Sequence, residues 1–464
     1  MTSYLYSKGV RIFDYPRFAE PYKEMIRNNA EEIAKENGID IEFIRKSGIR
    51  KEAIIAEKIK ERGTEAGLVH IISAMETCFT YKPWHDKKTG RTFVRPDQSK
   101  CLHYYFYFID KELGLCYVRV PTWCPFRLQI YFNGHNVLAK ELDSEGISYT
   151  MLDNAFDSIG DAAKAQTLSD NIDIKKIHHC LDEFAWKYCP VYKELGLRYH
   201  WSIMQAEYAT DIVFKRQSTL KGIYEEIMKT AIHTVKPENI ATFLGRKLDN
   251  RYQGEIGNNY NVRIEGSRIK HTMGKCSIKM YDKFSKILRI ESTTNDVTFF
   301  KHYREVVHRD GTKSMKNAPL KKGIYSLGML KDNLSSSNKR YLEFISAFNN
   351  NEIGRKRLFR ISSSKTENSR NYKGFNFFES NDLHLLLSIL KGQFNISGFQ
   401  NKDLQKLLGL NSGQVSRLLK RLRVHGLIKK VGNTYKYYVN KLGKETIIMA
   451  EKLKEIVIVP ALCY

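Results

Sequence analysis

Three helical stretches followed by a hairpin, over residues 382–440, constrain the fold of this chain more than any other pattern in it. Apolar residues recur at helical spacing in each stretch, and the stretches are 382–394, 401–408 and 413–425. Gly409 ends the second stretch where glycine commonly terminates a helix, and Asn411 or Ser412 can cap the third. The segment LIKKVGNTYKYYVN, which follows Gly426, predicts a β-hairpin.

The charge of this region is one-sided. Leu404–Lys444 holds ten Lys or Arg and no Asp or Glu. Because such a surface attracts phosphates, we expect it to face a nucleic acid. The candidates for base contacts, through the pairing of glutamine with adenine and of arginine with guanine, are Gln414, Ser416 and Arg417. The candidates for phosphate contacts are Lys420, Arg421, Lys429, Lys430 and Lys436.

Two short motifs in this region carry a family resemblance. Gln414-Val415-Ser416-Arg417-Leu418-Leu419 and Gly426-Leu427-Ile428 resemble the winged helix-turn-helix of MarR-type regulators. The resemblance implies that the third helix lies in the major groove of duplex DNA, with its N-terminal residues nearest the base edges. Winged helices also serve in replication proteins and transposases, and a protein-interaction role stays open, so the motif alone does not define the function.

The composition of the whole chain points to the same class of partner. Lys plus Arg is 76 against 51 for Asp plus Glu, which gives a net charge of +25. DNA is the expected partner of such a protein and RNA stays open, while a Lys-rich genome is the alternative explanation of the charge. The eight cysteines form no CxxC pair, and no stretch approaches the ~18 apolar residues of a membrane span. We therefore expect a cytoplasmic protein with reduced thiols and no membrane partner.

The remaining patterns predict an α+β protein of several domains, as a chain of 464 residues allows. Aromatic and β-branched runs bounded by turn residues indicate two clusters of strands, at 101–135 and 260–294, and 299–307 favours a helix. The predicted parts are a helical N-terminal region over 1–100, a mixed α/β sheet region over 101–348, a basic linker over 349–378 and a winged helix domain over 379–464.

The two strand clusters share an order of features that suggests a duplicated α+β unit. FYFIDKELGLCYVRV has an aromatic strand, the pair Asp110-Lys111, a turn and a strand with Arg119. IKMYDKFSKILRIE has the pair Asp282-Lys283 and a strand with Arg289 in the same order. Hairpins that begin with Asp-Lys are common, so independent origin of the two clusters stays open.

The second cluster carries a further resemblance. In CSIKMYDKFSKILRIESTTND, a strand ending in Tyr-Asp-Lys precedes a strand with Arg-x-Glu. This arrangement resembles the core of replication initiation factors of rolling-circle plasmids and filamentous phages. The resemblance implies a tyrosine that attacks DNA and acidic or histidine side chains that hold a divalent metal, Mg²⁺ or Mn²⁺. The His-hydrophobic-His motif of most rolling-circle nucleases is absent from the sequence.

This resemblance assigns a role to five residues. Tyr281 is the candidate nucleophile, Lys283 and Arg289 are candidate phosphate clamps, and Glu291 and His271 are candidate metal ligands. Alternate residues of a strand share a face, so Arg289 lies beside Glu291, and His271 on the neighbouring strand could join them. The alternative is that Tyr281 packs on the sheet and that Glu291 pairs with Lys279 or with neighbours of Arg289.

Two functions follow from these patterns. The first is a replication-initiator-like protein of a plasmid, phage or mobile element, whose core binds DNA, single-stranded DNA included, and nicks it through Tyr281. The second is a non-catalytic regulator or transposition accessory factor, whose N-terminal part serves homodimerisation or the recognition of nucleic-acid shape. The sequence has no P-loop and no GxGxxG motif, so no nucleotide cofactor is expected. Trp84-His85-Asp86, with Lys87, Lys88 and Arg91, is a candidate nucleic-acid contact loop.

Overall fold

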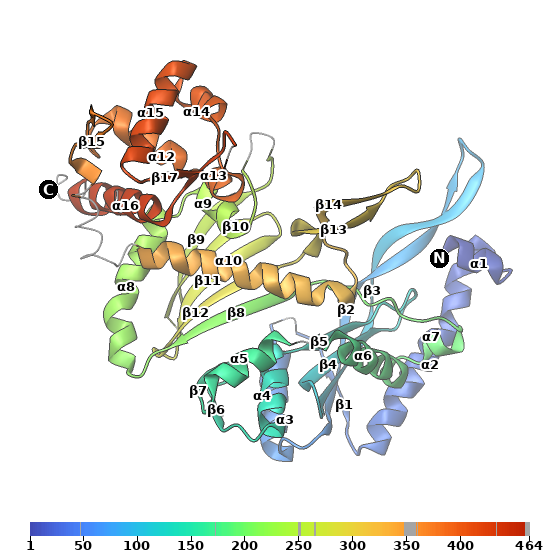
Figure 1. Cartoon of the computed structure of the whole chain (residues 1–464). Helices are drawn as coiled ribbons and strands as arrows, with labels where there is room; N and C mark the ends of the chain where they lie inside the picture. The colour runs from blue at the N-terminus through green and yellow to red at the C-terminus, as the bar shows by residue number, and fades with distance from the viewer. Residues whose placement is uncertain are drawn as a thin grey trace. The chain divides into compact units, whose positions relative to one another are not determined.

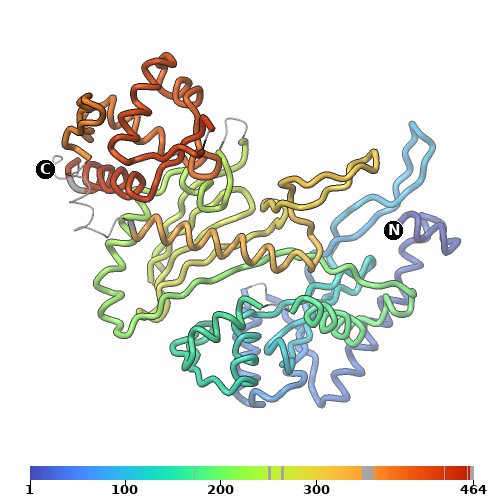
Figure 2. The backbone as a smooth tube through the Cα atoms, in the orientation of Figure 1, coloured from blue at the N-terminus to red at the C-terminus, as the bar shows by residue number. Residues whose placement is uncertain are grey.

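The computed structural model describes residues 1–46, 48–171, 173–248, 252–263, 266–347, 359, 361–432 and 434–459. It divides into two compact units, Met1–Trp201 and Ser202–Tyr464, each of which mixes helices and strands (Figures 1 and 2). Within the described residues, no helix has both the length and the apolar character that crossing a bilayer requires.

The first unit is built on one five-stranded sheet of order β1-β2-β3-β4-β5. Its first strand runs parallel to β2 and the other neighbours are antiparallel. The strands are β1 (Ile41–Ile44), β2 (Gly67–Asp86), β3 (Arg91–Asp110), β4 (Gly114–Pro121) and β5 (Gln129–Phe132), and a separate hairpin joins β6 (Tyr149–Met151) to β7 (Phe156–Ile159).

Helices pack on both faces of this sheet because β3 alternates two sets of aromatic residues. Phe106 and Phe108 stack on Tyr188 of a helix on one face, and Phe108 packs edge-on against Phe184 of the same helix. Tyr105 and its neighbours pack with a second helix on the other face. The helices of the unit are α1 (Thr2–Ser7), η1 (Ile12–Asp14), α2 (Tyr15–Glu36), α3 (Lys51–Arg62), α4 (Gly134–Ser144), α5 (Ala162–Asp170), α6 (Ile174–Tyr188) and α7 (Val191–Glu194).

The prediction of a helical region over 1–100 is wrong for residues 67–100, which form β2 and most of β3. The run from Leu68 to Ala74 is buried on both faces of the sheet. A strand of this kind shows no alternation of apolar and polar residues, so its sequence does not distinguish it from a buried helix. The loop predicted around Trp84-His85-Asp86 is instead the end of β2, next to the turn at 87–90.

The second unit contains an antiparallel five-stranded sheet of order β8-β12-β11-β10-β9. One face packs against helices, and α10 runs along the strands (Figure 1). The strands are β8 (Ala206–Val213), β9 (Ile256–Arg263), β10 (Gly266–Met273), β11 (Cys276–Lys283) and β12 (Ile287–Thr294); the helices are α8 (Gln217–Thr234), α9 (Pro237–Phe243) and α10 (Leu327–Ala347), with short turns η2 (Val297–Phe299) and η3 (Ile324–Ser326).

The predicted helix at 299–307 is also wrong. Lys301–Val307 forms strand β13, which pairs with β14 (Lys313–Pro319) in a separate hairpin. Its exposure alternates residue by residue.

The two Asp-Lys hairpins close differently. Asp110 lies opposite Gly114, whereas Asp282 lies opposite Leu288. Both hairpins lie inside five-stranded sheets, but only the first sheet contains a parallel pair. A duplication therefore stays a prediction.

The C-terminal part of the second unit has its own core, in which Val415, Leu419 and Leu422 are buried with Leu385 and Leu404. Its helices are α12 (Ser380–Ile389), α13 (Gly392–Ser397), α14 (Asn401–Leu408), α15 (Ser412–Val424), α16 (Lys441–Lys452) and η4 (Leu453–Ile458); its hairpins are β15 (Lys365–Glu367) with β16 (Arg370–Tyr372), and β17 (Ile428–Lys430) with β18 (Tyr437–Val439).

The predicted linker over 349–378 needs correction. Residues 349–358 and 360 lie outside the described part of the chain. From residue 361 onward the chain joins the C-terminal core, where Ile361, Phe375 and Phe377 are buried. The sequence did not predict that these residues are buried, because a few apolar residues scattered through a polar, basic stretch show neither a helical nor a strand period.

Asn338 fastens α10 to the sheet of the second unit. It is fully buried, its Nδ2 donates to the carbonyl oxygens of Tyr208 and Ile290 at 2.9 and 3.1 Å, and its Oδ1 accepts from Ser292 at 2.6 Å. These contacts satisfy polar groups of β8 and β12 in a place that water does not reach.

We predict that Asn338→Ala lowers the free energy of unfolding by about 2–3 kcal/mol, because buried polar groups lose their partners. Asn333→Ala, on the same helix, removes one bond to the Met329 carbonyl near the surface and should cost less than about 1 kcal/mol. Urea unfolding followed by circular dichroism measures both. Equal losses would contradict this account of α10.

Candidate functional site

Four polar side chains gather on the sheet face of β11 and β12 that lies opposite the helices. Lys279 pairs in register with Glu291, and Tyr281 pairs with Arg289. The Tyr281 hydroxyl donates to Glu291 Oε2 at 2.8 Å, and Lys279 Nζ donates to Glu291 Oε1 at 2.5 Å. The structure therefore brings the predicted Tyr281, Arg289 and Glu291 together, and it confirms the pairing of Glu291 with Lys279 that the alternative interpretation predicts.

Arg289 is tied to a carboxylate that the sequence did not identify as its partner. Its side chain is buried, and Nε and Nη2 donate to the two carboxylate oxygens of Asp211 on β8 at 2.7 and 2.6 Å. A buried, bidentate pair of this kind holds its arginine firmly. The predicted role of Arg289 as a phosphate clamp would require this pair to open, whereas a role in positioning β8 against β12 would not.

The environment opposes ionisation of Tyr281 and favours that of Glu291. Burial raises the pKa of Tyr281, and the negative charge of Glu291 raises it further. Burial would also raise the pKa of Glu291, but the hydrogen bond and charge of Lys279 outweigh it, so this pKa is lowered. A protonated phenol thus donates to an ionised carboxylate. Glu291 is the base within reach of the phenolic proton, but both pKa shifts oppose this transfer in the protein without a bound substrate.

His271 is not part of this cluster. It lies on the helix-packed face of β10, opposite Ile278, and is fully buried. Its ring nitrogens bond to Asn258 Oδ1 at 2.7 Å and to the Tyr341 hydroxyl at 3.0 Å, and burial lowers its pKa to about 3. The prediction erred because the sequence gives the alternation along each strand but not the register between β10 and β11.

Lys283 lies two residues beyond Tyr281 on the same face, at the end of β11. Its Nζ lies 5.1 Å from the centre of the Phe284 ring. Because it lies on the same face as Tyr281, Lys283 remains a candidate for contact with a bound phosphate.

The cluster does not present the ligand set that the expected Mg²⁺ or Mn²⁺ requires. Both oxygens of Glu291 accept from Lys279 and Tyr281, and both oxygens of Asp211 accept from Arg289. Among the described residues, no group of three or more His, Cys, Asp or Glu is placed to hold a metal. We therefore derive no chemical step through a metal ion.

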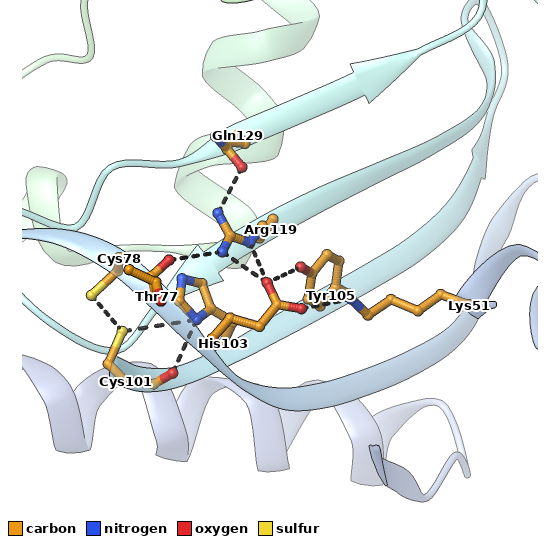
Figure 3. Close-up of polar contacts among 9 residues, drawn as sticks. Lys51, Thr77, Cys78, Cys101, His103, Tyr105, Arg119 and Gln129 are labelled. Atoms are coloured by element: carbon orange, nitrogen blue, oxygen red, sulfur yellow. Dashed lines mark hydrogen bonds and ion pairs between the residues drawn. The ribbon is translucent and has the colours of Figure 1, made fainter. Parts of the chain in front are cut away.

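The first unit contains a second tyrosine–glutamate cluster, which the sequence did not reveal. Figure 3 shows Lys51, Tyr105 and Arg119 converging from α3, β3 and β4. All three donate to Glu76 of β2: Lys51 Nζ at 2.6 Å, the Tyr105 hydroxyl at 2.6 Å and Arg119 Nη2 at 2.8 Å. Arg119 also donates to Gln129 Oε1 of β5 at 2.7 Å. One carboxylate therefore links four elements.

In the second cluster, as in the first, cations and hydrogen bonds keep a glutamate ionised against the effect of burial. Burial would raise the pKa of Glu76, but the hydrogen bonds from Lys51 and Tyr105 hold it at about 2. Arg119 and Arg289 occupy similar places in the two Asp-Lys hairpins, and this similarity pointed to a second cluster. It was insufficient because Glu76 falls in a segment that the sequence did not identify as a strand. The thiols of Cys78 and Cys101 lie beside the cluster, 2.9 Å apart (Figure 3).

The predicted DNA-contact residues divide into two sets. Arg421 belongs to the interior, because Nη1 and Nη2 donate to the two oxygens of Asp382 at 2.6 and 2.7 Å and Nη2 also donates to the Gly374 carbonyl at 2.6 Å. Its guanidinium stacks on Phe375 at 4.0 Å. Arg421, on α15, therefore holds the segment that precedes α12 in place. The prediction that it contacts phosphates is wrong, because its guanidinium is occupied inside the domain.

Three other candidates have partners within the domain. Gln414 Oε1 accepts from the Asn411 amide at 2.9 Å as half of the capping box of α15, and the Ser416 hydroxyl accepts from Asn401 at 2.9 Å. Lys420 pairs with Glu367 of β15. These bonds occupy side-chain atoms that a base or phosphate would contact, so they compete with the predicted roles.

The second set is exposed. It comprises Arg417, Arg423, Lys429, Lys430 and Lys436. No ion-pair partner for any of the five occurs in the part of the chain that the structure describes. Arg423 was not among the predicted contacts, although it lies on the same helix. These residues give α15 and the β17–β18 hairpin a positive surface, and Lys402 and Lys406 of α14 are also exposed.

Comparison of the chain with protein-family models, with curated proteins and with solved structures found no match.

We predict that Arg421→Met destabilises the protein by about 3 kcal/mol, because Asp382 is left buried without its cation. Arg423→Met, an exposed substitution two residues along the same helix, should change stability by less than about 0.5 kcal/mol. Thermal unfolding of the two variants against the wild type tests this. A destabilised Arg423→Met protein beside an unaffected Arg421→Met protein would reverse the two assignments.

The pKa of Glu76 gives a pH prediction. The pKa of this carboxyl is 4.5 when unperturbed and about 2 in the folded chain, so its stabilising effect is present above about pH 4.5 and is lost as the pH falls toward 2. Glu76→Gln should therefore weaken the loss of stability across this window, and should lower stability at pH 7. Glu65→Gln, at an exposed residue, is the control. An unchanged pH profile in Glu76→Gln would refute the role of the cluster.

Proposed function

We propose that residues 361–459 form a winged helix-turn-helix that binds duplex DNA through α15 and the β17–β18 hairpin. The observation that carries the proposal is the set of five exposed arginines and lysines on these two elements, which have no ion-pair partner among the described residues. Cations that are not neutralised within the protein are available to replace the counterions of DNA phosphates.

The local geometry supports this assignment. Three residues join α14 to α15, and Gly409 adopts a left-handed φ of 66°, as a tight turn after a helix requires. Asn411 then caps α15 through the Gln414 amide at 2.9 Å. The hairpin is extended by Phe399, whose amide and carbonyl bond to Tyr437 at 2.9 and 2.8 Å. Two helices, α12 and α13, precede the pair α14–α15, and this pair followed by the hairpin is the order of a helix-turn-helix and its wing.

Roles within the interface follow from position. Arg417 lies in the first half of α15 with an exposed side chain, so it is the best placed residue for a base edge. Lys429, Lys430 and Lys436 belong to the hairpin and would hold phosphates on either side of the groove. Gln414 and Ser416 would contact bases only if they exchanged their present partners.

We predict that a fourfold variant, Arg417→Ala, Arg423→Ala, Lys429→Ala and Lys430→Ala, binds duplex DNA more weakly and reduces the salt slope of log K by about 3. Substitution is preferable to deletion, because Leu390 and Ile448 pack against the core of the sheet and Glu451 pairs with Lys236 at 2.8 Å. Fluorescence anisotropy with a labelled duplex at several salt concentrations measures both quantities.

The matched control removes four other exposed cations of the same unit, through Lys215→Ala, Arg216→Ala, Lys221→Ala and Lys339→Ala. It has the same net charge as the first variant, so it isolates position from charge. Equal salt slopes for the two variants would show that α15 and the hairpin have no special part in binding.

A second candidate function is the nicking of single-stranded DNA, and the Tyr281–Glu291 hydrogen bond favours it. In this step the Tyr281 oxygen would attack a phosphodiester phosphorus and form a 5′-phosphotyrosine bond. Glu291 would accept the phenolic proton. The bond from phosphorus to the departing 3′ oxygen would break, and that oxygen would take a proton from water. Lys279 and Lys283 are the cations nearest in sequence to the phenol.

We predict that the wild type forms a covalent adduct with single-stranded oligonucleotides, with or without Mg²⁺ or Mn²⁺, and that Tyr281→Phe forms none. Tyr105→Phe is the matched control, because Tyr105 also donates to a glutamate but belongs to the other cluster. Denaturing gels and mass spectrometry detect the adduct. Its absence from the wild type under all conditions would leave the non-catalytic DNA-binding function alone.

A further inference from the structure

The β2–β3 hairpin continues far beyond the sheet to which it belongs. β1 pairs with β2 only over Ile71–Ala74, and β4 pairs with β3 only over His103–Asp110. The two strands nevertheless stay paired from Thr77 opposite Lys100 to Asp86 opposite Arg91. Figure 2 shows this two-stranded extension, in light blue, running out from the rest of the sheet. We refer to residues 77–100 as the arm.

Aromatic contacts hold the base of the arm. Tyr81 packs edge-on against Phe79 and Tyr15, and the Arg127 guanidinium lies 3.8 Å above the Phe79 ring. Near the tip, the Val94 amide donates to Thr2 Oγ1 at 3.2 Å. A two-stranded ribbon is marginally stable by itself, so these contacts are what keep the arm extended.

The outer part of the arm carries cations without acidic partners. Lys87, Lys88 and Arg91 are exposed, and none has an ion-pair partner within the described residues. The nearby Asp86 carboxylate is committed to the turn, where it accepts from the Lys88 amide at 3.0 Å and from the Thr89 hydroxyl at 2.7 Å. The arm as a whole has six Lys or Arg against two Asp.

One face of the arm presents an aromatic ring and a cation together. Trp84 and Arg95 lie on the same face, and the Arg95 guanidinium stacks on the Trp84 ring at 3.7 Å. The indole remains 41% exposed. A stacked guanidinium keeps its N–H groups directed outward, so it can donate to phosphate or base oxygens without further ordering.

We propose that the arm is a second DNA-binding element, which places its tip and its Trp84–Arg95 face in a groove of duplex DNA. The major groove is about 12 Å wide and admits a two-stranded ribbon. The five outermost residue pairs, from Lys82 opposite Arg95 to Asp86 opposite Arg91, span about 17 Å, which is about half a turn of the double helix. The positive charge of the arm favours a polyanion as its partner. The fit of a two-stranded ribbon to the major groove favours duplex DNA over a single strand.

The proposal is independent of the function proposed for α15, because the arm belongs to the other unit. The test uses the full chain with Lys87→Ala, Lys88→Ala and Arg91→Ala combined. The control combines Lys35→Ala, Lys60→Ala and Lys175→Ala, which removes the same charge from exposed residues elsewhere in the first unit. Anisotropy titrations use a fluorescein-labelled duplex of mixed sequence and, separately, one of its strands.

The arm variant should bind the duplex about ten- to a hundredfold more weakly than the control, with a salt slope smaller by about 2 to 3. Equal duplex binding by the two variants would overturn the proposal, and so would a loss confined to the single strand. The fourfold variant of α15 and the hairpin is titrated in parallel. A loss in the arm variant with none in the α15 variant would support the arm and refute the function proposed for α15, whereas the opposite pattern would do the reverse.

Discussion

Buried carboxylates pair with some of the lysines and arginines of this chain. This pairing determines which of the cations stay exposed and unpaired. Glu76 joins Lys51, Tyr105 and Arg119 across three strands and a helix, Asp211 fixes Arg289 between two strands, and Asp382 fixes Arg421 beneath α15. Each pair costs desolvation, which close hydrogen bonding offsets, and removal of one partner leaves a buried charge. With 76 Lys and Arg against 51 Asp and Glu, many cations stay exposed at the surface, and those on α15, on its hairpin and on the β2–β3 arm are among them.

The sequence predicted well where local pattern determines structure. The helices over 401–408 and 412–424, the turn at Gly409 and the strand pair around Tyr281 follow from the spacing of apolar residues and from turn residues, whereas the stretch predicted as one helix over 382–394 forms two, α12 and α13. It failed where contacts are distant. The buried run at 68–74 of β2 shows no alternation of apolar and polar residues. His271 lies on the other face of the sheet from Glu291, because the register between two strands cannot be read from either strand alone. The partner of Arg421 lies 39 residues away in the chain. The sequence shows which residues are charged, but it does not show which oppositely charged residue each of them contacts in the fold.

The presence of two similar tyrosine–glutamate clusters weakens the case for nicking relative to the case for DNA binding. Each sheet holds a tyrosine hydroxyl against an ionised glutamate that also binds a lysine. Such a cluster stabilises adjacent strands whether or not it reacts, so its presence twice favours a structural role for at least one copy. The C-terminal surface has no comparable structural explanation, because its exposed cations lack partners among the described residues. DNA binding is accordingly the central claim, and nicking is secondary.

Amide hydrogen exchange of the full chain, with and without saturating duplex DNA, tests the central claim most directly. The amides of Ser412 and Gly413 at the start of α15 have no carbonyl partner within the helix, and those of Val431 and Thr434 are held by single bonds in an exposed hairpin, so contact with DNA should slow exchange in both elements. The account predicts that this protection is among the strongest in the protein. Unchanged exchange in both elements, under conditions where the DNA is bound, would contradict it.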